Sequence, residues 1–184
     1  MRVIAGRYKG RRLFTPSDNR IRPTSDRLRE RLFSILSNQT PGSRVLDLYA
    51  GTGALGIEAI SRGAASATFV DISKDALTVI EKNIAQLDLQ SVAQILRWDI
   101  RSSLHCLQSV SLPFDIVFMD PPYEEELVVM TLRHLVDCKA LSSGALIVAE
   151  HHVREPILEI PNILKPTDQR RQRKSLVSFF RYML

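Results

Sequence analysis

Cysteine, histidine and long apolar runs are scarce in this chain of 184 residues. Its two cysteines, Cys106 and Cys138, lie too far apart for a metal site and are expected to be reduced thiols of a cytoplasmic protein. The adjacent pair His151-His152 lacks helical ligand spacing, so no metal is expected. No apolar signal segment and no stretch of eighteen apolar residues occur, which argues against secretion and against a membrane span.

A glycine-containing segment, residues 47–53 (Asp-Leu-Tyr-Ala-Gly-Thr-Gly), joins an apolar run to a helical pattern. Residues 44–49 are typical of a buried parallel strand, and residues 54–62 carry apolar side chains at helical spacing. Glycines in such a turn let the backbone approach a ligand, and the helix that follows presents unpaired N–H groups there. The segment therefore predicts a nucleotide cofactor site that includes Ala50, Gly51, Thr52 and Gly53.

Two acidic residues bear on the identity of the cofactor. Asp71 ends the next apolar run, twenty residues after Gly51, where a carboxylate can accept two hydrogen bonds from a ribose diol. Residues 51–56 also satisfy the dinucleotide fingerprint, so a nicotinamide or flavin oxidoreductase is the rival interpretation. Asp47 favours S-adenosylmethionine, because its carboxylate would repel a pyrophosphate but could hold the ammonium of a methionine moiety. A solvated strand end or a helix cap is the simpler alternative for Asp47.

The tetrapeptide Asp120-Pro121-Pro122-Tyr123 follows a fourth apolar run, residues 114–119, at a position where open α/β sheets bind ligands. Asp120 could accept one N–H of an exocyclic amine and the Pro121 carbonyl another, while the two prolines fix the turn. Tyr123 offers a ring on which an extruded base could stack. With the cofactor loop upstream, the motif predicts methylation of a nucleobase amine, on guanine N2 or adenine N6. An ordinary turn is the alternative.

Several further short segments accompany the glycine loop and the tetrapeptide and are spread over nearly the whole chain. They are residues 1–6, 9–11, 22–27 (Arg-Pro-Thr-Ser-Asp-Arg), 46–56, 61–65 and Glu150-His151. By these segments the chain resembles the bacterial 16S ribosomal RNA guanine-N2 methyltransferases of the RsmD type. The resemblance implies S-adenosylmethionine as the cofactor and methylation of N2 of a guanine in small-subunit RNA, within the small subunit or an assembly intermediate. It also implies that residues 120–123 form the reacting motif.

The resemblance assigns further residues to the cofactor, and two departures from the family pattern accompany them. Asp99 is expected beside the adenine amino group, although Trp98 stands where the family tends to have a small residue. Residues 170–175 (Arg-Arg-Gln-Arg-Lys-Ser) stand where relatives usually carry a Tyr-Gly-x-Thr stretch, and are expected to form a loop. Ile72 and Ile100 are further expected cofactor residues. Arg22 and Thr24 are expected at the cofactor from their position just before a predicted helix, where they could close over its carboxylate with Arg22 as the anion partner.

Apolar runs that alternate with helical patterns predict an α/β fold with a mostly parallel sheet covered on both faces. The resemblance makes this a Rossmann-like class I methyltransferase of three layers, with seven strands, an antiparallel last strand that closes the sheet, and an N-terminal β-hairpin and helix. We expect one methyltransferase domain, residues 1–184, with a basic extension (1–23) before the catalytic core (24–184), acting as a monomer. Expected helices are 25–38, 54–62, 75–87 and 126–136; expected strands are 44–49, 67–70, 92–96, 114–119, 144–149 and 176–183.

The net charge of +5 conceals an uneven distribution. Residues 1–31 carry ten Lys/Arg and three Asp/Glu, residues 165–184 six and one, and residues 32–164 nine and sixteen. A polyanion is therefore expected to dock on the basic ends, although a solvated charged face is the alternative. The expected RNA contacts are Arg7, Lys9, Arg11 and Arg12 in the hairpin, and Arg170, Arg171, Arg173 and Lys174 near the other end.

Overall fold

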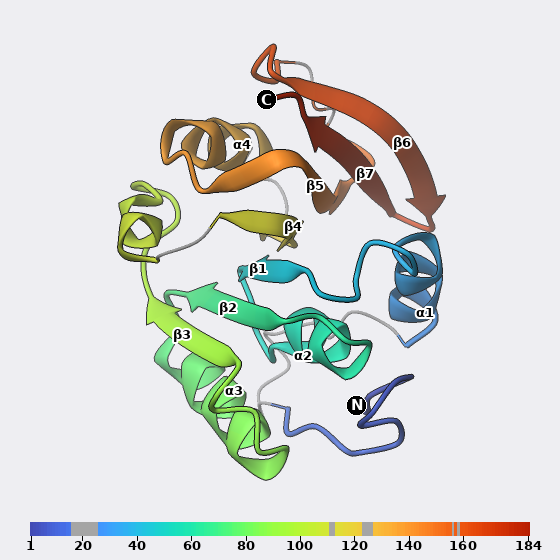
Figure 1. The fold of residues 1–184 in the computed structure, drawn as a ribbon. Coiled ribbons are helices and arrows are strands. Elements are labelled where there is room, and N and C mark those ends of the chain that lie inside the picture. Colours follow the sequence, from blue (N-terminus) through green and yellow to red (C-terminus); the bar gives the residue numbers. More distant parts are fainter. Residues whose placement is uncertain (16–25, 111–112, 123–126, 156, 158) are drawn as a thin grey trace.

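A computed structural model describes the chain except for residues 16–25, 111–112, 123–126, 156 and 158 (Figure 1). Its seven-stranded sheet has the order β3-β2-β1-β4-β5-β7-β6. All neighbouring strands are parallel except that β7 runs antiparallel to both β5 and β6. The strands are β1 (Arg44–Leu48), β2 (Ser66–Asp71), β3 (Ala93–Arg97), β4 (Phe114–Met119), β5 (Leu141–His152), β6 (Leu164–Gln172) and β7 (Ser175–Tyr182).

Helices cover both faces of this sheet and enclose two apolar cores (Figure 1). The helices α1 (Asp26–Ile35), α2 (Ala54–Ser61) and α3 (Lys74–Gln86) lie on one face. The helix α4 (Leu127–Asp137) and the short 3-10 helix η1 (His105–Ser109) lie on the other. Adjacent residues of β1 alternate between the two cores, Val45 facing α2 and Leu46 facing α4, as expected for a strand buried on both sides. The predicted Rossmann-like architecture is confirmed.

Two details of the predicted strands are wrong. The last strand, β7, does not close the sheet, because β6 pairs with its outer side. β6 was not predicted: Leu164 is its one buried residue, and residues 170–175, expected to be a loop, form the end of β6, a turn and the first residue of β7. An edge strand that pairs on one side only needs few apolar residues, so its sequence resembles an irregular stretch.

The N-terminal helix also differs from its prediction. α1 ends at Ile35 rather than near residue 38, and Ile35 is exposed while Leu28, Leu32 and Leu36 are buried. The predicted first residue of this helix, Ser25, lies outside the described residues.

Residues 1–14 fold back on themselves and join the core on the α2 side. Arg2 forms an antiparallel bridge with Arg12, and the Val3 N–H donates to the Arg11 carbonyl over 2.9 Å. Val3 and Leu13 are buried in the same core as α1, α2 and α3. The segment thus lies against α2 and α3 as an integral part of the described fold (Figure 1).

Candidate active site

The carboxyl ends of four neighbouring strands bring the predicted site residues to one edge of the sheet. Leu48 of β1 pairs with Val70 of β2 and with Met119 of β4. Asp71 and Asp120, which follow these two partners directly, therefore stand on either side of the loop that follows β1. The chain leaves β1 toward β2 on one side and returns as β4 on the other, which makes this the switch point where open α/β sheets bind ligands.

The loop after β1 turns tightly and brings α2 close to the sheet. Tyr49, Gly51 and Gly53 have positive φ angles of 57°, 55° and 73°, and the Gly53 N–H donates to the Ala50 carbonyl over 2.7 Å. A Cβ on Gly56 would lie 2.4 Å from the Phe69 ring, so α2 can sit this close to β2 only with glycine there. The loop backbone is therefore held at the N-terminus of α2, where unpaired N–H groups favour a ligand.

Asp71 fastens this loop to the neighbouring strand. Its Oδ2 accepts the Gly51 N–H and its Oδ1 accepts the Ser73 N–H, each over 2.9 Å. Each carboxylate oxygen keeps a second lone pair, so two further hydrogen bonds remain open to a ribose diol. The side chain of Ile72, next along the chain, is 56% exposed and offers an apolar surface at the same strand end.

Asp47 lies beneath the loop rather than on its surface. It is 2% exposed, and its Oδ2 accepts the Gly56 N–H in the first turn of α2 over 2.9 Å. The structure therefore excludes a solvated strand end and shows the capping contact. Burial, with a smaller contribution from the charge of Asp71, raises the pKa of Asp47 to about 7. A cation placed nearby would favour its ionised form.

Asp99 and its neighbours stand one strand further along, because Asp71 pairs with Arg97 of β3. Asp99 is half-buried, and its Oδ1 accepts the Arg101 N–H over 3.0 Å. The indole of Trp98 donates to the Ser103 carbonyl and packs against the α4-side core, so this departure from the family pattern has a structural role. Ile100 is buried in that core, so its side chain faces the protein interior.

The tetrapeptide that was predicted to be the reacting motif begins where β4 ends. Asp120 is half-buried, Pro121 is buried and Pro122 is exposed. Asp120 and Glu150, which follows Ala149 of β5, line one small cavity with apolar residues of α1, α2 and the sheet. Three predicted site residues, Tyr123, Arg22 and Thr24, lie outside the described residues. The side chains of Ala50 and Thr52 are buried, so the loop would meet a ligand with its backbone.

The two groups of predicted RNA contacts lie at opposite ends of the parallel strands. In the N-terminal hairpin, the Arg7 N–H donates to the carbonyl of Ser61, at the end of α2, and the Arg11 guanidinium to that of Gln86, at the end of α3. Both helices start at the carboxyl edge, so these C-terminal ends lie at the other edge, away from Asp120. Arg7, Lys9, Arg11 and Arg12 are all exposed.

The second basic group lies at the active-site edge. The Val153 N–H, just beyond β5, donates to the Lys174 carbonyl over 3.0 Å, so the turn between β6 and β7 lies beside the end of β5. Arg173 and Lys174 form this turn, and all four basic residues from 170 to 174 are exposed. The Nε of Arg170 lies 2.8 Å from the Oδ2 of Asp168, so its charge is already paired. The other three basic residues of this group, Arg171, Arg173 and Lys174, are therefore the stronger candidates for RNA contact.

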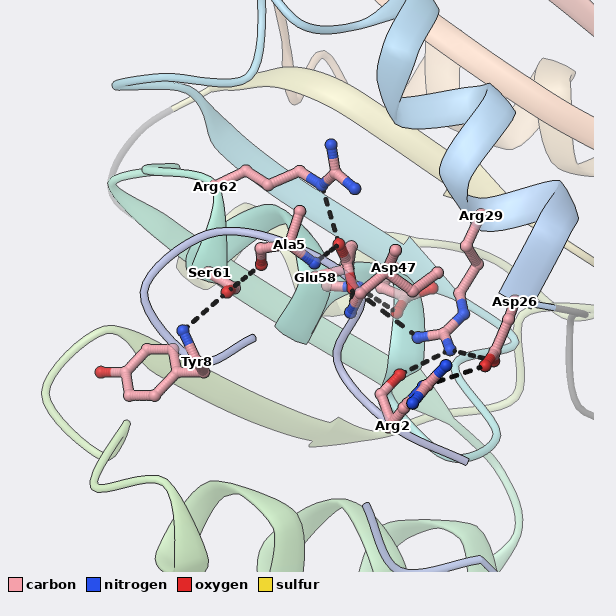
Figure 2. A network of polar contacts seen from close by, with 11 residues as sticks. Arg2, Ala5, Tyr8, Asp26, Arg29, Asp47, Glu58, Ser61 and Arg62 are labelled. Atoms are coloured by element: carbon pink, nitrogen blue, oxygen red, sulfur yellow. Dashed lines mark hydrogen bonds and ion pairs between the residues drawn. The ribbon is translucent and has the colours of Figure 1, made fainter. Parts of the chain in front are cut away.

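A buried polar network, which the sequence analysis missed, joins residues 1–8 to α2 (Figure 2). The carboxylate of Glu58, fully buried in α2, accepts the N–H groups of Ile4 and Ala5 over 2.8 and 3.0 Å. It also lies 2.8 Å from Arg62 Nε and 3.8 Å from Arg29 Nη1. Glu58 is the one charged residue in the segment 54–61. Charged residues are seldom fully buried unless they are paired, so this isolated charge was the one sign in the sequence of the buried network.

Arg29 carries this network to α1. Its guanidinium is fully buried, and Nη2 donates to the Arg2 carbonyl over 2.7 Å and to Asp26 Oδ1 over 2.8 Å (Figure 2). The opening segment, α1 and α2 are thus tied together by charged groups beneath the loop that leads to the site.

His151 and the cysteines are built into the fold. The His151 ring contacts the Glu155 carbonyl and the Ser178 hydroxyl, both over 2.9 Å, and burial lowers its pKa. Burial also raises the pKa of the Cys106 thiol to about 11, which leaves it unreactive near neutral pH. Within the described part of the chain, no three His, Cys, Asp or Glu residues are grouped as a metal site, and no helix is long and apolar enough to cross a membrane.

Comparisons with known proteins agree with the geometry. The family model described as Conserved hypothetical protein 95 matches residues 1–181. Ribosomal RNA small subunit methyltransferase D of Buchnera aphidicola (strain APS) is 38% identical over 85% of this chain and 80% of its own length. The Escherichia coli (strain K12) protein of the same name is 35% identical over 88% and 79%. The solved structure of yhhF from Escherichia coli superposes with a TM-score of 0.88 at 32% identity, over 100% of this chain and 98% of that chain. The chain therefore belongs to the Conserved hypothetical protein 95 family, a family of methyltransferases, as its motifs predicted.

Proposed function

We propose that this protein transfers a methyl group from S-adenosylmethionine to the N2 amine of a guanine in small-subunit ribosomal RNA. The observation that carries the proposal is the adjacency of β1 and β4, one of which ends at the glycine loop and the other at Asp120. A cofactor bound over β1 and β2 and an amine bound at Asp120 would meet at this switch point. The names of the relatives from Buchnera aphidicola and Escherichia coli support ribosomal RNA as the substrate.

The residues around the loop suit this cofactor. When bound, S-adenosylmethionine supplies a methyl group activated by a positively charged sulfur. Asp71 retains lone pairs for two ribose hydroxyls, and the exposed side chain of Ile72 would cover one face of the adenine. Asp47 lies beside the loop, and its pKa of about 7 means that a nearby cation can readily ionise it. The ionised Asp47 carboxylate would hold the ammonium group of the cofactor. Asp99 would accept from the adenine amino group.

Asp120 and the prolines would prepare the target amine. The lone pair of guanine N2 is delocalised into the ring, so the amine must be held as it becomes tetrahedral. Asp120 would accept one N–H and the Pro121 carbonyl the other, which directs the remaining lone pair at the methyl group. When the new N–C bond has formed, N2 must lose one proton, and Asp120 would accept it and pass it to water.

Ribosomal RNA would dock across the active-site edge, with the turn between β6 and β7 as its main basic contact. Arg171, Arg173 and Lys174 are exposed there, beside the end of β5. Arg7, Lys9, Arg11 and Arg12 at the far edge would meet the same RNA or subunit at a distance from its target. Substrate of this kind implies action in the cytoplasm, where ribosomal subunits assemble, and the protein would act as a monomer.

The test is methylation of small subunits isolated from cells that lack the gene. Purified protein with labelled S-adenosylmethionine should convert one guanine to N2-methylguanosine, identified by mass spectrometry of the digested RNA. The Asp120→Ala variant should lose this activity and keep its affinity for the cofactor, whereas Asp137→Ala, exposed at the end of α4, should behave as the parent. Formation of N6-methyladenosine, or of no methylated base at all, would refute the proposal.

A further inference from the structure

The helix α4 is hydrogen-bonded to the loop that follows β1. The hydroxyl oxygens of Tyr49 and Thr131 lie 2.8 Å apart. Thr131 is fully buried, and the Tyr49 side chain packs against the α4-side core. Tyr49 also has a φ angle of 57°, a conformation that costs a non-glycine residue free energy and persists only where the surroundings enforce it. The contact with Thr131 is therefore part of what holds the loop in its shape.

The same helix also holds the segment that follows β3. Nδ1 of His134 lies 3.0 Å from the carbonyl oxygen of Ile100. A carbonyl oxygen can only accept a hydrogen bond, so Nδ1 is the protonated nitrogen of this ring. Residues three positions apart lie on the same side of a helix, as Thr131 and His134 do. One side of α4 thus contacts both segments at which the cofactor is expected to bind.

α4 is also the helix that follows the tetrapeptide. β4 leads directly to Asp120, and α4 begins at Leu127, within the same crossover from β4 to β5. Asp71 fixes the glycine loop to the end of β2, and Asp47 of β1 fixes the first turn of α2 beneath it. These two bonds place the loop relative to β1 and β2. The Thr131 contact differs from them, because it places the loop relative to the helix that follows Asp120.

We propose that Thr131 is a positioning residue for methyl transfer: through Tyr49 it aligns the glycine loop, and the methyl group of the cofactor with it, with the amine held at Asp120. This inference rests on the proposed function and adds to it a fully buried residue that would touch neither the cofactor nor the RNA. A displacement of about 1 Å between reacting groups can slow a reaction about 100-fold. The contact therefore affects the chemical step more than it affects binding.

Removal of the Thr131 hydroxyl tests the proposal. Thr131→Val keeps the branched shape of the side chain but cannot bond to Tyr49. In single-turnover assays on small subunits, with cofactor and protein in saturating amounts, this variant should transfer methyl groups about 10- to 100-fold more slowly than the parent. Its dissociation constant for S-adenosylhomocysteine, measured by calorimetry, should be nearly unchanged, because Asp71 and Asp47 still hold the loop.

Further variants separate alignment from stability. Thr131→Ser restores the hydroxyl group and should restore most of the rate, although it removes a buried methyl group. Tyr49→Phe removes the other hydroxyl and should slow methyl transfer to a similar extent, with little further loss when it is combined with Thr131→Val. Thr78→Val, the same change at an exposed position of α3, is the matched control and should transfer methyl groups at the parental rate.

Each alternative gives a different result. A Thr131→Val variant that is less stable in urea but transfers methyl groups at the parental rate would overturn the inference, because a purely structural hydroxyl would act in that way. A rate that recovers at higher concentrations of cofactor or protein would also contradict it, since this would show a loss of binding. A parent protein that does not methylate small subunits would refute the proposed function and this inference together.

Discussion

Asn83 donates a hydrogen bond of 3.0 Å to the carbonyl oxygen of Thr52, in the middle of the glycine loop. The same fully buried amide is paired with the backbone of Phe14: its Oδ1 accepts the Phe14 N–H over 2.7 Å, and its Nδ2 donates to the Phe14 carbonyl over 3.2 Å. One side chain of α3 thus fixes both the cofactor loop and the last part of the N-terminal segment.

Replacement of Asn83 should affect stability and cofactor binding together. Asn83→Ala leaves the backbone groups of Phe14 and the buried carbonyl of Thr52 without their partner, which should lower the free energy of unfolding by about 2–4 kcal/mol. The loop would also lose its fixed position, so the dissociation constant of S-adenosylhomocysteine should rise. Urea denaturation and calorimetry measure the two effects. Gln90→Ala, at an exposed position nearby, is the control, and an Asn83→Ala variant with parental cofactor affinity would contradict the proposed link.

Glu58 should be among the most sensitive positions for stability. Glu58→Ala removes the acceptor of Ile4, Ala5 and Arg62 and leaves the buried Arg29 with less counter-charge, so we expect a loss of about 3–5 kcal/mol. The double variant Glu58→Ala/Arg29→Met should lose less than the sum of its two single variants, since it leaves no buried charge behind. Strict additivity in urea denaturation would show that the two side chains do not interact.

Asp47 predicts a specific dependence of stability on pH. Its pKa is about 7 in the folded protein, above the ordinary value of 3.8, so the folded state retains a proton that the unfolded chain loses. The retained proton contributes fully to the free energy of unfolding below pH 4. This contribution is lost as the pH rises to about 7, which lowers the free energy of unfolding by up to about 4 kcal/mol. Asp47→Asn removes it, so the variant should gain stability relative to the parent from pH 4 to 7 and no more above pH 8. A difference independent of pH in urea denaturation would refute this.

The same residue offers a test of the cofactor's orientation. If the ammonium group of S-adenosylmethionine lies near Asp47, binding at pH 7 should lower the pKa of that carboxyl group and release part of a proton. Calorimetry in buffers of different ionisation enthalpy measures this release, and Asp47→Asn should abolish it. Equal proton release by parent and variant would place the ammonium elsewhere.

The position of the two basic groups predicts unequal effects on RNA binding. Arg171, Arg173 and Lys174 changed together to Ala should weaken binding to small subunits and reduce the salt dependence by roughly 0.7–0.9 log unit for each phosphate that is no longer neutralised. The matched triple variant, with Arg7, Lys9 and Arg12 changed to Ala, should weaken RNA binding less. The reason is that these three side chains lie at the other ends of the strands, away from Asp120. Filter binding over a range of salt concentrations compares the two variants. A larger effect of the N-terminal triple variant would reverse the proposed docking geometry.

The parts of the fold that the sequence predicted best are the strands buried on both faces. β4 matches its predicted limits, 114–119, because every residue except Asp115 is apolar and packs into one of the two cores. β5 extends beyond the predicted 144–149 on both sides: Leu141 pairs with β4 before these residues, and residues 150–152 pair with β7 after them. β6 escaped prediction because backbone hydrogen bonds to β7 hold it while most of its side chains remain exposed.

The site was predictable where function requires unusual local sequence, and not where support comes from ordinary residue types. Gly51, Asp71 and Asp120 are recognisable from their spacing relative to strand ends. Arg29 and Asn83 were missed because each occupies a helical position beside apolar neighbours, where a polar side chain is usually exposed. Their long-range hydrogen bonds go to backbone groups of residues 2, 14 and 52, and no spacing in the sequence indicates such contacts.

The N-terminal segment has a consequence for the order of assembly. Ile4 binds a side chain 54 residues later in the chain, and Arg12 accepts a hydrogen bond from Gln86, 74 residues later. During synthesis, which delivers about 5–20 residues each second, residues 1–14 would leave the ribosome several seconds before α3 exists to receive them. Residues 1–14 thus reach their native contacts only after α2 and α3 are made, and Val3 and Leu13 remain exposed to chaperones throughout that interval.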